Sequence, residues 1–211
     1  MTNPILYGPG YSTYVRSVRL ALAEKGVHYQ FEEFDFLQGM PAEQLARHPF
    51  AKVPAFRHDD FQLYETPAII RYVDEAFPGP SLQPETPRQR ARMTQIIGIL
   101  DGYGYGPIIS DVVIQRVVMP MMGQESDEER IQAALPRAEK CIQVLERFLD
   151  EHTYLASESV SLADLHLVPI YDYFNSTPDG DPILERAPKL VQWWSAMSAL
   201  DSVTYTKPSL G

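Results

Sequence analysis

The spacing of hydrophobic residues along the chain changes once, near residue 77. Before that point, short apolar runs alternate with helical patterns. Pro4–Tyr7 is a strand-like run closed by a Gly-Pro-Gly segment. From Ser12 to Lys25 the apolar residues recur every three or four positions, as on one face of a helix, and Gly26 follows as a C-terminal stop. The chain is therefore predicted to begin with a strand, a loop and a helix.

The next segments predict an edge strand, a hairpin and a second helix. His28–Phe36 is aromatic-rich and alternates in part, but two adjacent glutamates break the period, which indicates a bulge or an edge strand. Two apolar runs, Val53–Phe56 and Phe61–Tyr64, flank a polar turn that contains two aspartates, as in a hairpin. Thr66 then caps a helix that ends near residue 77, with a proline in its first turn. The polar stretch before the hairpin leaves room for one more helix.

A proline-rich connection separates this part from a helical remainder. Residues 78–87 contain four prolines and a glycine, a composition that ends a helix and stiffens the chain. Beyond it, nearly every segment has helical spacing. The predicted helices are 88–100, 109–119, 127–151, 161–173 and 188–200. The sequence thus predicts an α/β domain in residues 1–77, a linker in 78–87 and an all-helical domain in 88–211.

The composition excludes several classes of function. The 211 residues, 45% of them hydrophobic, are enough to bury the cores of two small domains. Because 28 acidic residues outnumber 18 basic ones, the formal charge is −10, and we expect neither nucleic acid nor a membrane surface as a partner. No apolar run approaches the ~20 residues that span a bilayer, and no targeting segment is visible, which predicts a cytoplasmic protein. The single cysteine, Cys141, allows no internal disulfide, and no Cys/His spacing predicts a metal site.

Ser12 is the first residue that could carry chemistry. It stands where the first predicted helix begins, and a helix N-terminus presents unpaired N–H groups and a partial positive charge that can hold an anion or a thiolate. Ser12 could equally serve only as the N-cap of its helix. The loop is not a nucleotide-binding loop, because it lacks the lysine and the glycine spacing of that motif.

Two further segments have a similar ambiguity. Pro54 could follow a cis bond, exposing the N–H and C=O of Val53 to an extended ligand, or it could open an edge strand in the ordinary trans form. Thr66 could bind a carboxylate at the start of its helix or simply cap it. Each of these segments is weak evidence when it is taken alone.

Taken together and in order, these segments resemble the glutathione-binding domain of the soluble glutathione transferases, closest to the serine-type, phi-like and related bacterial groups. The likeness extends into the helical part and covers nearly the whole chain. The motifs that carry it are Ser12, His48-Pro49-Phe50-Ala51-Lys52-Val53-Pro54-Ala55-Phe56, Glu65-Thr66-Pro67-Ala68-Ile69-Ile70-Arg71-Tyr72, Ser161-Leu162-Ala163-Asp164 and Ala187-Pro188-Lys189-Leu190-Val191-Gln192-Trp193.

The resemblance implies a thioredoxin-like first domain with a mixed sheet that binds glutathione, and an all-helical second domain that forms the second-substrate pocket. It implies that Val53 beside cis Pro54 pairs with the cysteinyl part of the peptide. Thr66 would bind the γ-glutamyl carboxylate, Glu65 would lie near the amino group, and Lys52 would lie near the glycyl carboxylate. Arg16 is a second basic candidate for this anionic ligand.

The sequence departs from the phi-like pattern in the second-helix loop. Gly39-Met40 stands where those proteins carry a His-Lys pair, and Ala51 replaces a common glycine. These changes bear on the contacts to the glycyl end of glutathione.

Two residues compete as the hydroxyl that stabilises the glutathione thiolate. We favour Ser12, while Tyr7 is the rival, because tyrosine-type relatives place their donor at the end of the first strand. The sequence contains no cysteine near residues 7–17, which argues against a thiol transferase. For the second substrate, Tyr11, Tyr103 and Tyr105 are candidate pocket residues, although the glycine-rich stretch that holds the last two could be only a packing kink.

The predicted function is therefore a detoxifying glutathione transferase that directs a thiolate at a small apolar electrophile. It would need no cofactor, glutathione being a co-substrate, and would form a homodimer. The alternatives are a glutathione-dependent isomerase or dehalogenase on the same scaffold, and a non-catalytic module that binds ligands or a protein.

Overall fold

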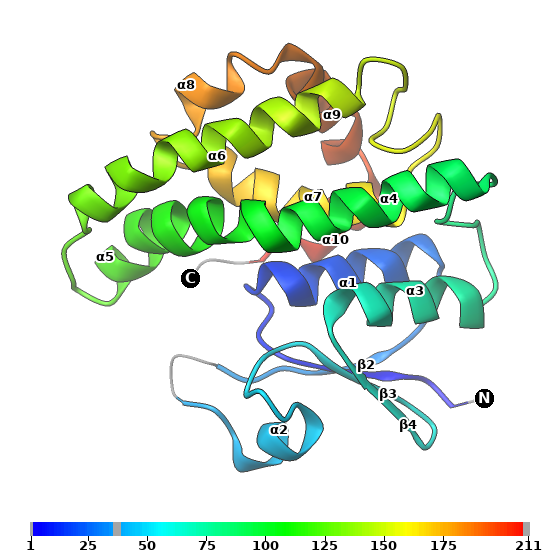
Figure 1. The fold of residues 1–211 in the computed structure, drawn as a ribbon. Coiled ribbons are helices and arrows are strands. Elements are labelled where there is room, and N and C mark those ends of the chain that lie inside the picture. The colour runs from blue at the N-terminus through cyan, green and yellow to red at the C-terminus, as the bar shows by residue number, and fades with distance from the viewer. Residues whose placement is uncertain (1, 36–38, 209–211) are drawn as a thin grey trace. The chain divides into compact units, whose positions relative to one another are not determined.

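The computed structural model describes residues 2–35 and 39–208, and their contacts divide the chain into two units (Figure 1). The first unit holds the described residues of Met1–Leu82 and of Leu200–Gly211, and the second is Gln83–Ala199. The division at Leu82 lies within the predicted linker. The C-terminal segment differs from the prediction, because α10 (Asp201–Thr206) packs against α1 (Thr13–Glu24) in the first unit.

The first unit contains a four-stranded mixed sheet with the strand order β2-β1-β3-β4. β1 (Ile5–Tyr7) runs parallel to β2 (Gln30–Glu32) and antiparallel to β3 (Ala55–His58), which forms a hairpin with β4 (Phe61–Tyr64). The thioredoxin-like fold and the edge strand are thus confirmed. β3 lies two residues later than predicted, because Arg57 and His58 continue the strand and Asp59, with φ +55°, takes the turn.

Side chains alternate between the two faces of this sheet. Phe56 faces α3 (Thr66–Ala76), where its ring contacts Tyr72 at 6.1 Å between centroids. Leu6 lies opposite Phe56 in the ladder and is fully buried on the same face, which α1 and α3 cover (Figure 1). Tyr7, the next residue, points to the other face. There α2 (Ala42–Arg47), the helix for which the sequence only left room, places the Arg47 guanidinium 3.9 Å from the centre of the Tyr7 ring.

A buried ion pair connects the end of α1 to the chain that leaves α3. Lys25 lies 3.1 Å from Asp74, and both side chains are almost fully buried. Lys25 also donates to the carbonyl of Pro80, and Asp74 accepts the N–H of Leu82 at 2.8 Å. Gly79 passes so close that a Cβ on it would lie 2.9 Å from the Lys25 carbonyl, which explains the glycine between two prolines.

The second unit is helical, as predicted, and is built around α7 (Leu162–Asn175). Every residue from Leu162 to Tyr171 is buried, so this helix has no solvent face in its first three turns. Short helices escaped prediction because a single turn shows no periodicity. The surrounding elements are α4 (Pro87–Ile99), α5 (Met119–Met121), α6 (Glu128–Phe148), α8 (Asp181–Leu184) and α9 (Pro188–Ser198).

The glycine-rich stretch does not break the helix that follows α4. The chain continues through η2 (Leu100–Gly104) and η3 (Gly106–Val118) in the wider winding of a π-helix. The N–H of Tyr105 accordingly donates to the carbonyl of Leu100, five residues earlier. Gly104 permits close packing on α6, because a Cβ there would lie 3.1 Å from the sulfur of Cys141. Within residues 2–35 and 39–208, no helix has the length and apolar character needed to cross a membrane.

A buried aspartate holds the start of α7. Asp164 forms the predicted capping box with Ser161 and accepts hydrogen bonds from the N–H of Leu155 at 2.9 Å and from the indole N–H of Trp193 at 2.9 Å. Burial raises the pKa of Asp164, while these hydrogen bonds favour the ionised form and lower it.

We predict that Asp164→Ala destabilises the second unit by roughly 3 kcal/mol or more, because several buried donors lose their acceptor at once. Both tryptophans lie in α9, so their fluorescence during urea unfolding reports on this unit. The matched control is Asp150→Ala, which removes an exposed carboxylate paired with Lys189 and is expected to cost less than about 1 kcal/mol. Equal urea midpoints for the two variants would contradict the role given to Asp164.

Candidate active site

A serine hydroxyl stands at the N-terminus of α1. Ser12 is the N-cap residue, and its Oγ accepts the backbone N–H of Val15 at 3.4 Å. The turn before it requires glycine, since Gly8 has φ +145° and a Cβ there would lie 2.6 Å from the Val15 side chain. Among the described residues the Ser12 hydroxyl has no acceptor for its own proton. This hydroxyl can therefore donate to a ligand while it caps the helix.

The N-terminus of α3 also has donors without an acceptor in the described part of the chain. Glu65, not Thr66 as predicted, is the N-cap residue, and its side chain caps no N–H group. Thr66 is the first helical residue, and Pro67 has no N–H. Within the described part of the chain, neither the N–H nor the hydroxyl of Thr66 makes a hydrogen bond. Glu65 adopts φ +71°, an unfavourable conformation for a residue with a side chain, of the kind that gathers at ligand-binding sites.

A cis proline lies in the segment between α2 and β3. The bond between Val53 and Pro54 is cis, which was one of the two alternatives left open by the sequence. The amide of Gln44 donates to the carbonyl of Lys52 at 2.9 Å and fixes the segment on α2. Ala51 has φ +51°, which explains why glycine is common at this position in the proteins that the sequence resembles. The exposed Lys52 side chain makes no ion pair within residues 2–35 and 39–208.

His48 links this segment to the start of α3, a role that sequence reasoning missed. Its ring is buried and packs on Tyr64 with 4.8 Å between centroids. Its Nε2 lies 4.0 Å from a carboxylate oxygen of Glu65. Desolvation lowers the pKa of His48, against the opposing effect of Glu65, so the ring is neutral near pH 7. The only sequence signal was its place four residues before Lys52.

The three segments come together around the first turn of α1. The Val53 side chain lies near Gly8, because a Cβ on that glycine would be 3.4 Å from the Cβ of Val53. His48 in turn reaches Glu65. Two helix N-termini with unpaired donors and the segment with the cis bond thus belong to a single site. Such a site suits an extended peptide that carries negative charge.

Comparison with known proteins decides the family. The N-terminal domain model of glutathione S-transferases matches residues 6–81, and the C-terminal domain model matches residues 109–201. A glutathione S-transferase of Arabidopsis thaliana is 31% identical over 89% of this chain and 91% of its own. The chain belongs to the glutathione S-transferase family. The predicted resemblance and enzyme class are confirmed, and the plant relatives of the transferase are of the phi class.

Solved structures give the same result for the fold. The transferase superposes on a glutathione transferase from Populus trichocarpa with a TM-score of 0.87 and 28% identity, covering 96% of this chain and 97% of the other. It superposes on glutathione S-transferase I bound with the ligand lactoylglutathione with a TM-score of 0.86 and 28% identity, covering 97% and 98% of the two chains. Both matches span the complete two-domain architecture.

Arg16 and Tyr7, two of the predicted site residues of the transferase, lie outside the cluster of Ser12, Val53 and Thr66. Arg16 is 1% exposed, and its guanidinium donates to the carbonyl of Val203 at 3.2 Å and contacts Thr206. It anchors α10 on α1 and is not presented to a ligand, in contrast to the sequence-based prediction. Tyr7 lies under Arg47 on the face of the sheet that α1 and α3 do not cover.

The predicted second-substrate residues are spread over both units of the transferase. Tyr11 is half-buried and donates to Asp35 at 3.2 Å. Tyr103 belongs to η2 and is 73% exposed, and the half-buried Tyr105 joins η2 to η3. Their part in an electrophile pocket stays a prediction.

The transferase offers no cysteine nucleophile at this site. Cys141 lies in α6 of the second unit, where burial raises the pKa of its thiol to about 11, so it stays protonated. In the described part of the chain, no three His, Cys, Asp or Glu side chains gather in a way that could hold a metal ion.

Proposed function

We propose that the transferase binds glutathione across the N-termini of α1 and α3 and ionises its thiol at the Ser12 hydroxyl. The observation that carries this proposal is a hydroxyl that caps α1 and still has a proton to donate. A free cysteine thiol with a pKa near 8.5 is only a few per cent ionised at pH 7. Lowering that pKa by about two units would require roughly 2.7 kcal/mol of added stabilisation of the thiolate.

Each part of the peptide meets a group of the first unit. The γ-glutamyl carboxylate accepts hydrogen bonds from the N–H and hydroxyl of Thr66. The amino group of the γ-glutamyl residue lies near Glu65, whose carboxylate is 4.0 Å from Nε2 of His48. The backbone of Val53 pairs with the cysteinyl residue, and Lys52 meets the glycyl carboxylate. The related structure with lactoylglutathione supports a glutathione derivative as the ligand of this fold.

The thiolate then attacks a small apolar electrophile. A bond forms between sulfur and the electrophilic carbon, and the leaving group departs with its electron pair. Ser12 supplies a hydrogen bond to the ionised sulfur before attack, and the positive end of α1 adds to that stabilisation. Tyr7 is poorly suited to this role, since its ring is covered by Arg47 on the other face of the sheet.

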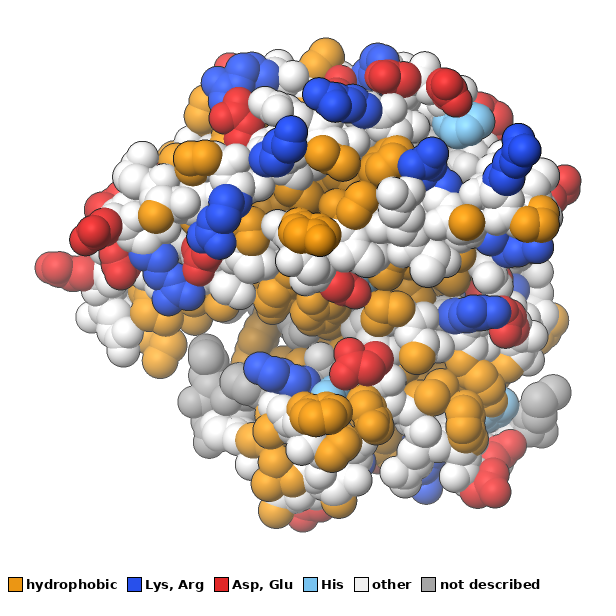
Figure 2. Space-filling view, in the orientation of Figure 1, with side chains coloured by type: hydrophobic (Ala, Val, Ile, Leu, Met, Phe, Trp, Pro, Cys, Tyr) orange, Lys and Arg blue, Asp and Glu red, His pale blue; other side chains and the backbone are white. Residues whose placement is uncertain are grey.

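We also propose that the transferase is a symmetric homodimer. Phe50 is 68% exposed at the tip of the segment after α2, where it packs edge-on against His48 and Tyr64. Leu45 and Phe61 of the same unit are about half exposed, at 50% and 46%. Figure 2 shows hydrophobic side chains gathered on the exposed surface over α2. A second copy of the chain would cover such a surface.

Our first test separates Ser12 from Tyr7. Ser12→Ala should raise the pKa of the bound thiol towards the free value and lower the conjugation rate at neutral pH, because only the ionised sulfur loses a partner. Ser12→Thr retains the hydroxyl and Tyr7→Phe retains the ring, so both should titrate near the wild type. The measurement is an ultraviolet titration of the thiolate in the glutathione complex. A raised thiol pKa in Tyr7→Phe with none in Ser12→Ala would reverse the assignment.

A second test concerns the charged ends of the peptide. Thr66→Ala and Lys52→Ala should each weaken glutathione binding by about 1.5–3 kcal/mol, since each removes a hydrogen bond to a charged group. Calorimetric titration measures the affinity. Thr66→Ser, which keeps the hydroxyl, and Lys140→Ala, on the surface of α6, are the controls. Wild-type affinity in a folded Thr66→Ala protein would remove Thr66 from the site.

The third test concerns assembly. Sedimentation at micromolar concentration should give about twice the chain mass of 23.9 kDa. Phe50→Glu should shift the equilibrium towards single chains, whereas Tyr205→Glu, which changes another exposed aromatic residue of the first unit, should not. A mass of one chain for the wild type would refute the dimer.

A further inference from the structure

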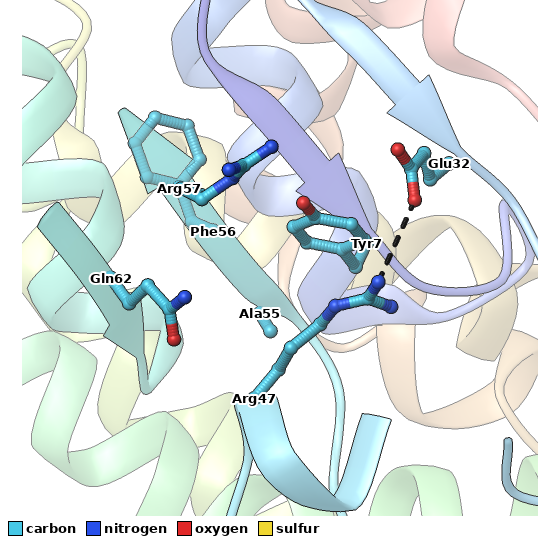
Figure 3. Close-up of a pocket in the computed structure, with 7 residues that line it drawn as sticks. All are labelled: Tyr7, Glu32, Arg47, Ala55, Phe56, Arg57 and Gln62. Carbon is cyan, nitrogen blue, oxygen red and sulfur yellow. Dashed lines mark ion pairs between the residues drawn. The ribbon is translucent and has the colours of Figure 1, made fainter. Parts of the chain in front are cut away.

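A cavity lies on the sheet face that carries Tyr7, away from α1 and α3. Its volume is about 280 Å³, slightly below the range of drug-sized ligand sites. Figure 3 shows that Arg47 reaches it from α2, whereas Arg57 and Gln62 come from the two strands of the hairpin. The full lining is Tyr7, Glu32, Arg47, Ala55, Phe56, Arg57 and Gln62. None of the residues proposed to hold glutathione is among them.

The strand register explains why these polar groups converge. Tyr7 lies opposite Ala55 in β3 and opposite Glu32 in β2, while Arg57 lies opposite Gln62 in β4. Residues two apart on a strand share a face, so all of them project to the side of Tyr7. The register of the sheet therefore places the strand residues of the cavity on one face, and α2 adds Arg47.

The cavity contains donors without a protein acceptor. Tyr7 is 4% exposed, and among the described residues its hydroxyl makes no hydrogen bond. In the same part of the chain the exposed Arg57 has no carboxylate partner. The hydroxyl of this largely buried tyrosine and the guanidinium of Arg57 line one cavity, and both are suited to bind an anion.

Arg47 is held in place but keeps donor capacity. Its guanidinium lies over the Tyr7 ring and 3.8 Å from a carboxylate oxygen of Glu32, a separation beyond a normal hydrogen bond. Two arginines thus face one glutamate, a local positive excess in a chain with a net charge of −10. The planar guanidinium matches the geometry of an oxyanion.

We infer that this cavity is a binding site for a small metabolite that carries a carboxylate or phosphate group, separate from the proposed glutathione site. The oxyanion would lie between Arg57 and Arg47 and accept the hydroxyl proton of Tyr7. The amide of Gln62 and the carboxylate of Glu32 would contact hydroxyl or amino groups on the rest of the molecule.

The test is a nuclear magnetic resonance titration of the full-length protein with inorganic phosphate and, separately, with acetate, at an ionic strength kept constant with chloride. At least one probe should shift the side-chain Nε–H signal of Arg57 saturably. Arg57→Ala should weaken that affinity roughly ten- to hundredfold, followed in this variant through the signal of Arg47. Arg57→Lys should restore only part of it, because the fork of donors is lost. Absence of saturable binding by both probes would refute the site.

Two controls distinguish the cavity from its surroundings. Arg71→Ala removes an exposed arginine of α3 that pairs with Glu75, so it changes the domain charge by the same amount. Its affinity should stay within about twofold of the wild type, and equal weakening in both variants would mean that the probes respond only to net charge. Saturating S-methylglutathione should leave probe binding unchanged, whereas competition would overturn the separation of the two sites. Conjugation by Arg57→Ala should match the wild type.

Discussion

The alternation of side chains along β1 is the constraint on which the first domain depends. Successive side chains of a strand point to opposite faces of the sheet, so Leu6 and Tyr7 lie in different environments. Leu6 is committed to the core beneath α1 and α3, and the ladder carries Phe56 and His58 to that same side. Tyr7 is thereby directed to the polar face beneath Arg47. In our proposal the hydroxyl that meets the thiol therefore comes from the chain after β1, where Ser12 begins α1.

The net negative charge of the protein agrees with a ligand site built from helix N-termini. A chain with a net charge of −10 does not attract an anionic peptide by its general field. The proposed recognition therefore relies on local groups at the N-termini of α1 and α3, whose electrostatic effect extends over about one turn of helix. Arg16 adds no positive charge to this site, because its guanidinium donates to backbone and hydroxyl oxygens of α10.

Sequence reasoning succeeded where one residue decides a local structure. Gly26 after α1 and the capping box at Ser161 and Asp164 could be predicted because their physics is contained in a few neighbouring residues. Arg16 could not be placed, since its partners lie almost 190 residues away in α10. The cavity escaped for a related reason. Its residues come from the four strands and from α2. The register of the sheet, not the spacing in the chain, brings the strand residues together.

The two binding sites that we propose in the first domain would hold an anion in different ways. At α1 and α3 the proposed donors are neutral backbone N–H groups and small hydroxyls, which are fixed by the helices. In the cavity the proposed donors are guanidinium groups on long side chains, of which Arg47 is held by the ring of Tyr7 and by Glu32. The sheet separates the face of the cavity from the face covered by the two helices. A change of charge at Arg57 can thus alter binding in the cavity while the geometry of Ser12 and Thr66 stays intact, because no hydrogen bond of Ser12 or Thr66 involves Arg57.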